Sequence, residues 1–118
     1  GWRLADETIL EEDGHFYEVL AADRADDPGA ADGLYDDFVL ACGLVAEEEL
    51  LLKMGPLLLR RPTEPFMRKW EGEARKLDAI CRQIEQSGSD PAQERLKALR
   101  REAEQIREVL TCLRTDKP

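Results

Sequence analysis

The side chains that most often serve as nucleophiles or bases are few in this sequence. There is one histidine, His15, and the two serines lie close together at positions 87 and 89. A Ser–His–Asp arrangement would need that segment to fold back onto His15, and no pattern predicts such a fold. The cysteines fit or adjoin the apolar stripes of expected helices, at positions Cys42, Cys81 and Cys112. We therefore expect no catalytic residue, and the sequence predicts a protein that is not an enzyme.

Metal and cofactor sites are equally hard to assemble from these residues. Glu12 and His15 have the Glu-x-x-His spacing that di-iron helical bundles use, but a second copy of the chain would have to supply the remaining ligands. The acidic segment from Asp23 to Asp37 lacks the spacing of a calcium-binding loop, and no glycine-rich phosphate loop is present. We expect no cofactor and no metal, and keep a metal-binding homodimer through Glu12 and His15 as an alternative function.

Charge is distributed unevenly along the chain. Its 118 residues, enough for one domain, include 26 acidic and 17 basic side chains, for a net charge of −9. Residues 1–59 hold 15 acidic and 3 basic side chains, and residues 60–118 hold 11 acidic and 14 basic. Either the two halves screen each other, or the acidic half meets a basic partner. A net acidic chain disfavours direct contact with nucleic acid, because phosphate binding needs surplus Lys and Arg.

The clearest pattern is a helical hairpin over residues 63–114. Apolar residues recur there at alternating spacings of three and four, which is typical of a helix that buries one stripe. They are Met67, Trp70, Ala74, Leu77, Cys81 and Ile84, then Ala92, Leu96, Leu99, Ala103, Ile106, Leu110 and Leu113. Gly88, Asp90 and Pro91 interrupt the pattern and provide signals for a helix end followed by a new start. A connection this short predicts two antiparallel helices.

The first half of the chain is less regular. Residues 34–54 read as helical, with a break near Gly43 and a new start at residues 46–50, and residues 57–61 can form one more turn. Residues 1–24 fit either a helix or a β-hairpin. In the hairpin, Asp13 and Gly14 form the turn, Leu10 faces Tyr17, and Thr8 faces Val19. We favour the helix, because a lone two-stranded hairpin is marginally stable.

These patterns predict an all-α fold and one helical domain over residues 1–118. The antiparallel, coiled-coil-like hairpin of residues 63–114 would pack with shorter acidic helices from residues 1–59, and a short β-hairpin at residues 8–19 is the alternative to one of them. No apolar run is long enough to cross a membrane, and scattered cysteines suit a reducing compartment, so we expect a cytoplasmic protein.

The function that these predictions favour is non-catalytic. We expect an adaptor, dimerisation or regulatory module that binds a protein or a second copy of itself, and neither nucleic acid nor membrane. An acidic inhibitor that occupies the basic site of a nucleic-acid-binding protein is a further alternative. The expected partner-binding residues are large and apolar, as in the centres of protein interfaces. They are Leu57, Leu58, Leu59, Met67 and Trp70.

Overall fold

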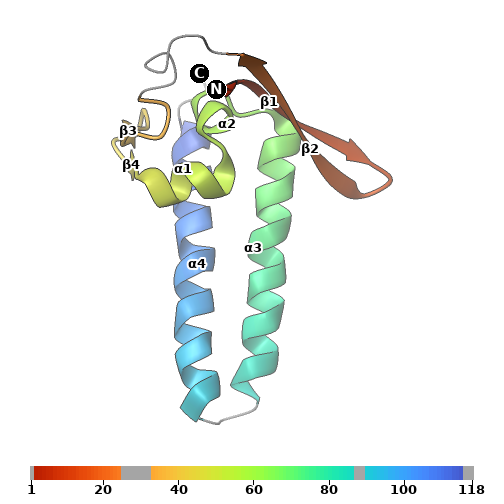
Figure 1. The fold of residues 1–118 in the computed structure, drawn as a ribbon. Helices are drawn as coiled ribbons and strands as arrows, with labels where there is room; N and C mark the ends of the chain where they lie inside the picture. The colour runs from red at the N-terminus through yellow and green to blue at the C-terminus, as the bar shows by residue number, and fades with distance from the viewer. Residues whose placement is uncertain (1, 25–32, 87–89, 116–118) are drawn as a thin grey trace. The chain divides into compact units, whose positions relative to one another are not determined.

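The computed structural model describes residues 2–24, 33–86 and 90–115 (Figure 1). It divides into two compact units, residues 1–66 and residues 67–118. Among these described residues, the first unit contains four strands and two short helices, and the second is made of two long helices. Because the strands are well formed, the predicted all-α class is wrong. The prediction of a single domain stays a prediction.

The chain begins with a long β-hairpin in place of the favoured helix. Strand β1 (Trp2–Glu12) pairs antiparallel with β2 (His15–Arg24). Leu10 pairs with Tyr17 and Thr8 with Val19, which is the register predicted for the alternative. The turn residues Asp13 and Gly14 both have positive φ, 51° and 79°. Two positive φ values in a two-residue loop match the right-handed twist of the strands, and Asp-Gly is among the few pairs that adopt them readily.

The first strand of the hairpin is packed against a helix. Ile9 of β1 is 2% exposed, and β1 contacts helix α2 (Pro56–Arg60). On the other face Leu10, Tyr17 and Val19 are about half exposed, at 52%, 51% and 48%. The hairpin is therefore not a lone two-stranded sheet, because β1 packs against α2 in the same unit.

A second short hairpin replaces the first part of the helix expected at residues 34–54. Strand β3 (Phe38–Val39) pairs antiparallel with β4 (Val45–Ala46). Between them the backbone reverses at Gly43, whose φ is 98°. The Leu40 amide donates to the Leu44 carbonyl and the Gly43 amide donates to the Leu40 carbonyl, both at 2.8 Å. These local bonds close the turn that the glycine permits, so the helix cannot extend through it.

The later part of that segment is helical, as the sequence predicts. Helix α1 (Glu48–Met54) has two acids in its first turn, where the helix dipole favours them, and buries Leu50, Leu51 and Met54. Gly55 separates it from α2, which begins with Pro56 at its first position. Gly55 is the N-cap residue of α2 and has no side chain to bond the free amides of the first turn.

A carboxylate from β1 supplies the missing cap. Oε1 of Glu7 accepts hydrogen bonds from the backbone amides of Leu57 at 2.6 Å and of Leu58 at 3.2 Å. Gly55 leaves room for this approach, since a Cβ at that position would lie 2.7 Å from Oε2 of Glu7. Glu7 therefore fastens the first β-hairpin to α2 through a charge-assisted N-cap that comes from a distant part of the chain.

The long helices lie where the sequence predicts them. They are α3 (Glu64–Glu85), which begins just before the second unit, and α4 (Asp90–Thr115). Most residues of the predicted apolar stripe are buried, and Cys81 is buried as a free thiol. The predicted turn residue Gly88 lies outside the described residues. None of the described helices is both long enough and apolar enough to cross a membrane.

Candidate nucleic-acid interface

The boundary between the units separates the charge nearly as well as the midpoint of the sequence does. Residues 1–66 carry 16 acidic and 5 basic side chains, whereas residues 67–118 carry 10 acidic and 12 basic. The second unit therefore has a small positive excess although the chain as a whole is acidic. Surface potential depends on such local distributions rather than on the net charge of the whole chain.

Arginines recur along one flank of α4 at intervals of seven residues. Each forms an ion pair with an acid of α3: Arg100 with Glu85, Arg107 with Asp78, and Arg114 with Glu71. The α3 partner moves back by seven residues each time the arginine moves forward by seven, which is the pattern of antiparallel helices lying side by side, as Figure 1 shows. The arginine side chains are about half exposed, so the pairs lie at the surface.

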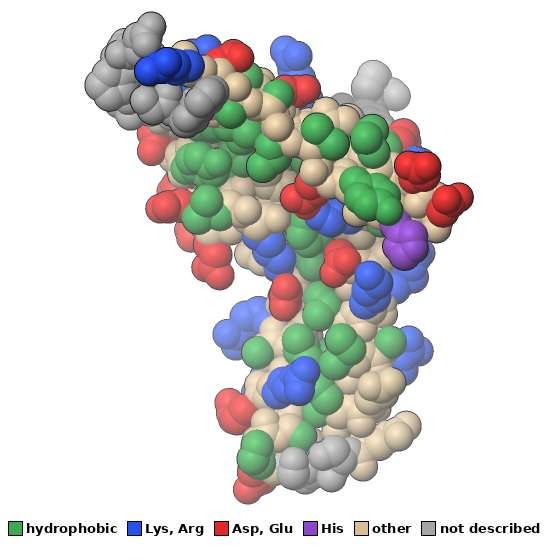
Figure 2. All heavy atoms as spheres, turned by 45° about the vertical axis from the view of Figure 1, so that its right-hand side comes forward, with side chains coloured by type: hydrophobic (Ala, Val, Ile, Leu, Met, Phe, Trp, Pro, Cys, Tyr) green, Lys and Arg blue, Asp and Glu red, His purple; other side chains and the backbone are tan. Residues whose placement is uncertain are grey.

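A second row of arginines runs along α3. Arg68, Arg75 and Arg82 are seven residues apart, and each lies three residues before one of the paired acids. Residues three apart are neighbours on a helix surface, so this row lies beside the acidic row. All three side chains are exposed. We call the two arginine rows and the acidic row between them the arginine face. Figure 2 shows Lys and Arg side chains recurring along the long helices.

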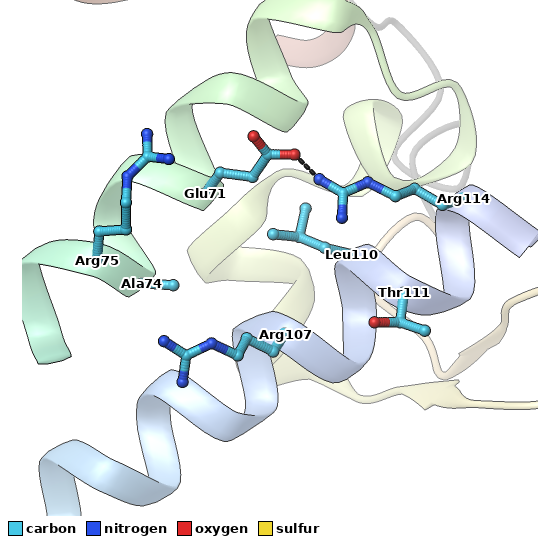
Figure 3. Close-up of a pocket in the computed structure, with 7 residues that line it drawn as sticks. All are labelled: Glu71, Ala74, Arg75, Arg107, Leu110, Thr111 and Arg114. Atoms are coloured by element: carbon cyan, nitrogen blue, oxygen red, sulfur yellow. Dashed lines mark ion pairs between the residues drawn. The ribbon is translucent and has the colours of Figure 1, made fainter.

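The arginine face contains a hollow of about 320 Å³ (Figure 3). Its apolar wall is formed by Ala74 and Leu110, which are each 4% exposed. The small side chain of Ala74 stands at a stripe position and leaves this volume open. The polar residues around it are Glu71, Arg75, Arg107, Thr111 and Arg114. Guanidinium groups and a hydroxyl are the donors that bind phosphate oxygens well.

The predicted partner-binding residues lie elsewhere. Leu58 and Leu59 of α2 are 4% and 1% exposed, and Leu57 is partly exposed. Met67 and Trp70 of α3 are also buried. These side chains contribute mainly to packing, and their role in binding a partner stays a prediction.

The predicted metal pair is not on a helix. Glu12 and His15 face each other across the first β-hairpin, beside its turn. Within the residues that the structure describes, no three His, Cys, Asp or Glu side chains are grouped so as to hold a metal. The helical Glu-x-x-His interpretation is therefore wrong for this segment.

The arginine face was missed at the level of sequence although its signal is there. Both rows repeat every seven residues, in step with the apolar stripe. A period shared by arginines and the buried stripe indicates that the charges lie on one side of the helix pair.

Comparison with known proteins decides the family. The family model for TrmK, described as tRNA (adenine(22)-N(1))-methyltransferase, matches residues 1–109. The chain belongs to this family. The tRNA (adenine(22)-N(1))-methyltransferase of Bacillus subtilis (strain 168) is 34% identical over 110 residues, which are 92% of this chain and 41% of that protein. The crystal structure of B. subtilis TrmK matches with a TM-score of 0.65 and 33% identity, over 92% of this chain and 42% of that one.

Membership of the TrmK family corrects several predictions. A family of tRNA methyltransferases contradicts the non-catalytic adaptor, the acidic inhibitor and the metal-binding bundle, and also the prediction that the protein is not an enzyme. It likewise contradicts the expectation of no nucleic-acid partner. The likeness to a methyltransferase structure agrees with the strands in rejecting an all-α fold. The chain spans about two fifths of the length of these relatives.

The described residues do not fit a site for a nucleoside-containing methyl donor. α/β enzymes commonly bind such groups where a glycine-rich turn leads from a strand into a helix N-terminus. Strand β1 instead turns directly into β2, and β4 leads into α1 through Glu47, with Glu48 and Glu49 in the first turn. No step of methyl transfer is therefore assigned to residues of this chain.

Proposed function

We propose that this chain works in the methylation of N1 of adenine 22 in tRNA, and that its part is to bind the tRNA. The observation that carries the proposal is the 34% identity to the B. subtilis enzyme across 92% of this chain. Because tRNA is a substrate inside the cell, we also propose a cytoplasmic location.

The reaction explains why a separate binding surface is useful. N1 lies on the Watson–Crick edge, so the base must be unpaired when it reacts. Contacts to the tRNA backbone can hold the molecule in place while the base is presented to the donor.

The arginine face is the surface of this chain that suits a tRNA backbone. Its arginines can neutralise phosphates and release counterions, which supplies sequence-independent affinity. Arginines spaced by seven residues lie about 10.5 Å apart along a helix. The rows therefore offer several contacts along an extended polyanion rather than one site for a small anion.

The most direct test removes the gene that encodes this sequence and measures 1-methyladenine at position 22 of tRNA. We expect the modification to disappear, because the proposal makes this protein necessary for it. It should return when the intact gene is supplied again. Other modified nucleosides in the same tRNA are the internal control and should be unchanged. An unchanged level of 1-methyladenine at position 22 would rule out the proposed function.

A binding assay tests the assigned surface. The protein carrying Arg68→Gln, Arg75→Gln and Arg82→Gln should bind tRNA more weakly. The slope of log affinity against log salt concentration should also be shallower, as expected for the loss of up to about three phosphate contacts. The matched control removes three basic charges that helical spacing places off the arginine face, with Lys76→Gln, Arg95→Gln and Arg101→Gln. Equal losses in both triple variants would show that only overall charge matters, and would contradict the assignment of this face.

A further inference from the structure

We propose that the hollow in the arginine face is a phosphate subsite, in which a backbone phosphate of the tRNA replaces the carboxylate of Glu71 as the partner of Arg114. This inference rests on the proposed function, because it identifies where the tRNA backbone is held and what controls access to that place. The same ion pair then has two roles: it orders the arginine in the free protein and competes with phosphate for it.

The ion pair between Glu71 and Arg114 is suited to such an exchange. It crosses the hollow, with Glu71 coming from α3 and Arg114 from α4 (Figure 3). The side chain of Arg114 is 53% exposed and that of Glu71 is 32% exposed. Water and salt reach both groups, so their attraction is screened and contributes little stability. A phosphate can therefore take over the guanidinium without leaving a buried charge unpaired.

The rest of the hollow supplies donors for the incoming phosphate. Arg75 forms no ion pair with any residue that the structure describes, so its guanidinium is available. Arg107 lies nearby but is held by Asp78, and Thr111 adds a hydroxyl. The hollow thus combines one available arginine with two that acids already order. Arginine donors arranged in advance lose less freedom when they bind phosphate oxygens.

The acid also gives the subsite selectivity. A single small anion must displace Glu71 with few other contacts, whereas a polyanion gains contacts from the whole arginine face at the same time. Glu71 therefore weakens the binding of every anion, and only a ligand with many phosphates overcomes that competition. A competing internal charge is one way to reject unwanted partners.

The test compares Glu71→Gln with Glu85→Gln in a tRNA-binding titration of the full chain. Both changes remove the acid of an ion pair with an α4 arginine, but only Glu71 lines the hollow. We expect Glu71→Gln to tighten tRNA binding by about threefold or more, since it removes the competitor. Glu85→Gln should tighten binding by less, since Arg100 belongs to the arginine face but does not line the hollow. Equal effects of the two changes, or weaker binding by Glu71→Gln, would overturn the proposal.

Single arginine variants provide a second test of the proposed subsite. Arg75→Gln and Arg114→Gln should each reduce tRNA affinity, and each should lower the salt dependence by about one phosphate contact. Arg101→Gln, on another side of α4, should leave the slope unchanged. Circular dichroism and thermal melting should show that every variant is folded, because all these side chains are exposed or partly exposed. Slopes that do not differ among the three variants would overturn the subsite.

Three further outcomes separate the explanations. Inorganic phosphate alone should bind the wild-type chain only in the millimolar range or weaker, and tighter binding would show a site for a free anion instead. If position 22 loses its methyl group on gene disruption while Glu71→Gln and Glu85→Gln behave alike, the subsite is wrong and the proposed function stands. If position 22 keeps its methyl group, the proposed function fails whatever the titrations show.

Discussion

Carboxylates act differently in the two units of this molecule. In the first unit, Glu7 binds backbone amides at the start of α2, and Glu48 and Glu49 occupy the first turn of α1. In the second unit, Glu71 and Asp78 pair with arginines from the neighbouring helix. Acids near helix N-termini stabilise short elements locally, whereas acids between two arginine rows order a surface that remains positive. The same residue type therefore lies at helix starts in one unit and pairs with a row of surface arginines in the other.

The two units also differ in the kind of contacts that stabilise each of them. The second unit repeats one pattern along two helices, so each part of its stripe resembles the next. The first unit depends on particular contacts, of which the bond from Glu7 to the amides of α2 is the clearest. A single substitution in the first unit should therefore act on one contact, while a substitution in the stripe should act through packing.

The largest loss of stability is expected from shortening a buried side chain in the core of the helix pair. Ile106 is 1% exposed, so Ile106→Ala should lower the free energy of unfolding by about 2–5 kcal/mol through lost burial and a cavity. Urea unfolding followed by circular dichroism measures it. Leu99→Ala should lower the free energy of unfolding by less, because Leu99 is only partly buried. A loss below about 0.5 kcal/mol at Ile106, the range of ordinary surface changes, would contradict its place in the core.

A side chain at Gly55 should disturb the first unit and leave the second intact. Gly55→Ala puts a Cβ 2.7 Å from the Glu7 carboxylate and holds alanine at a φ of 103°, so we expect a loss of about 1–3 kcal/mol. Thermal unfolding measures the loss, and hydrogen exchange locates it. Faster exchange in α2 with unchanged protection in α4 is the expected result. A variant as stable as the wild type would show that the cap can rearrange freely.

Removing the acid itself should have a smaller effect. Glu7→Ala leaves the amides of Leu57 and Leu58 without their carboxylate partner and should cost about 1–2 kcal/mol. Glu7→Gln should cost less, because an amide oxygen still accepts these bonds. Hydrogen exchange at the two leucine amides distinguishes the variants. Identical stability of Glu7→Ala and wild type would mean that the cap does not hold β1 to α2.

The smallest change has the opposite sign. Gly72 lies inside α3, and a Cβ there meets no atom within 4 Å. Gly72→Ala should therefore stabilise the protein by about 0.5–1 kcal/mol, because alanine loses less backbone freedom in a helix. A rise in melting temperature measures this gain. Together with Gly55→Ala it forms a matched pair, since one glycine is required by its conformation and the other is not. A lower melting temperature would mean that position 72 is more crowded than it is in this structure.

The contrast between the units also explains what the sequence could predict. The stripe that contains Ala74, Ile106 and Leu110 has a helical period, so α3 and α4 follow from the sequence with nearly their observed bounds. The Asp13-Gly14 turn and the pairing of Leu10 with Tyr17 can also be predicted from the sequence. The helix was favoured over this hairpin because no local sequence pattern indicates the elements that pack against it. The cap from Glu7 joins residues 50 positions apart and has no period at all.

The function was misread for a related reason. Summing charge over the whole chain hid the arginine rows, because most of the acidic excess belongs to residues 1–66. Counting Arg68, Arg75 and Arg82 by their spacing would have placed three positive charges on one helical face. The described strands do not lead into a helix through a glycine-rich turn, which is the pattern that would have indicated a site for a methyl donor.

The exposed face of the β-hairpin has a practical consequence for anyone who handles this chain by itself. In the part of the chain that the structure describes, strands β1 and β2 form a two-stranded sheet, and Leu10, Tyr17 and Val19 stand exposed on one side of it. Among the described residues no further strand pairs with either outer edge. Long unprotected edges with apolar neighbours are templates for strand addition between molecules. At high protein concentration, strand addition between molecules should therefore produce soluble oligomers rich in β-structure. Leu10→Lys or Val19→Lys should reduce this self-association.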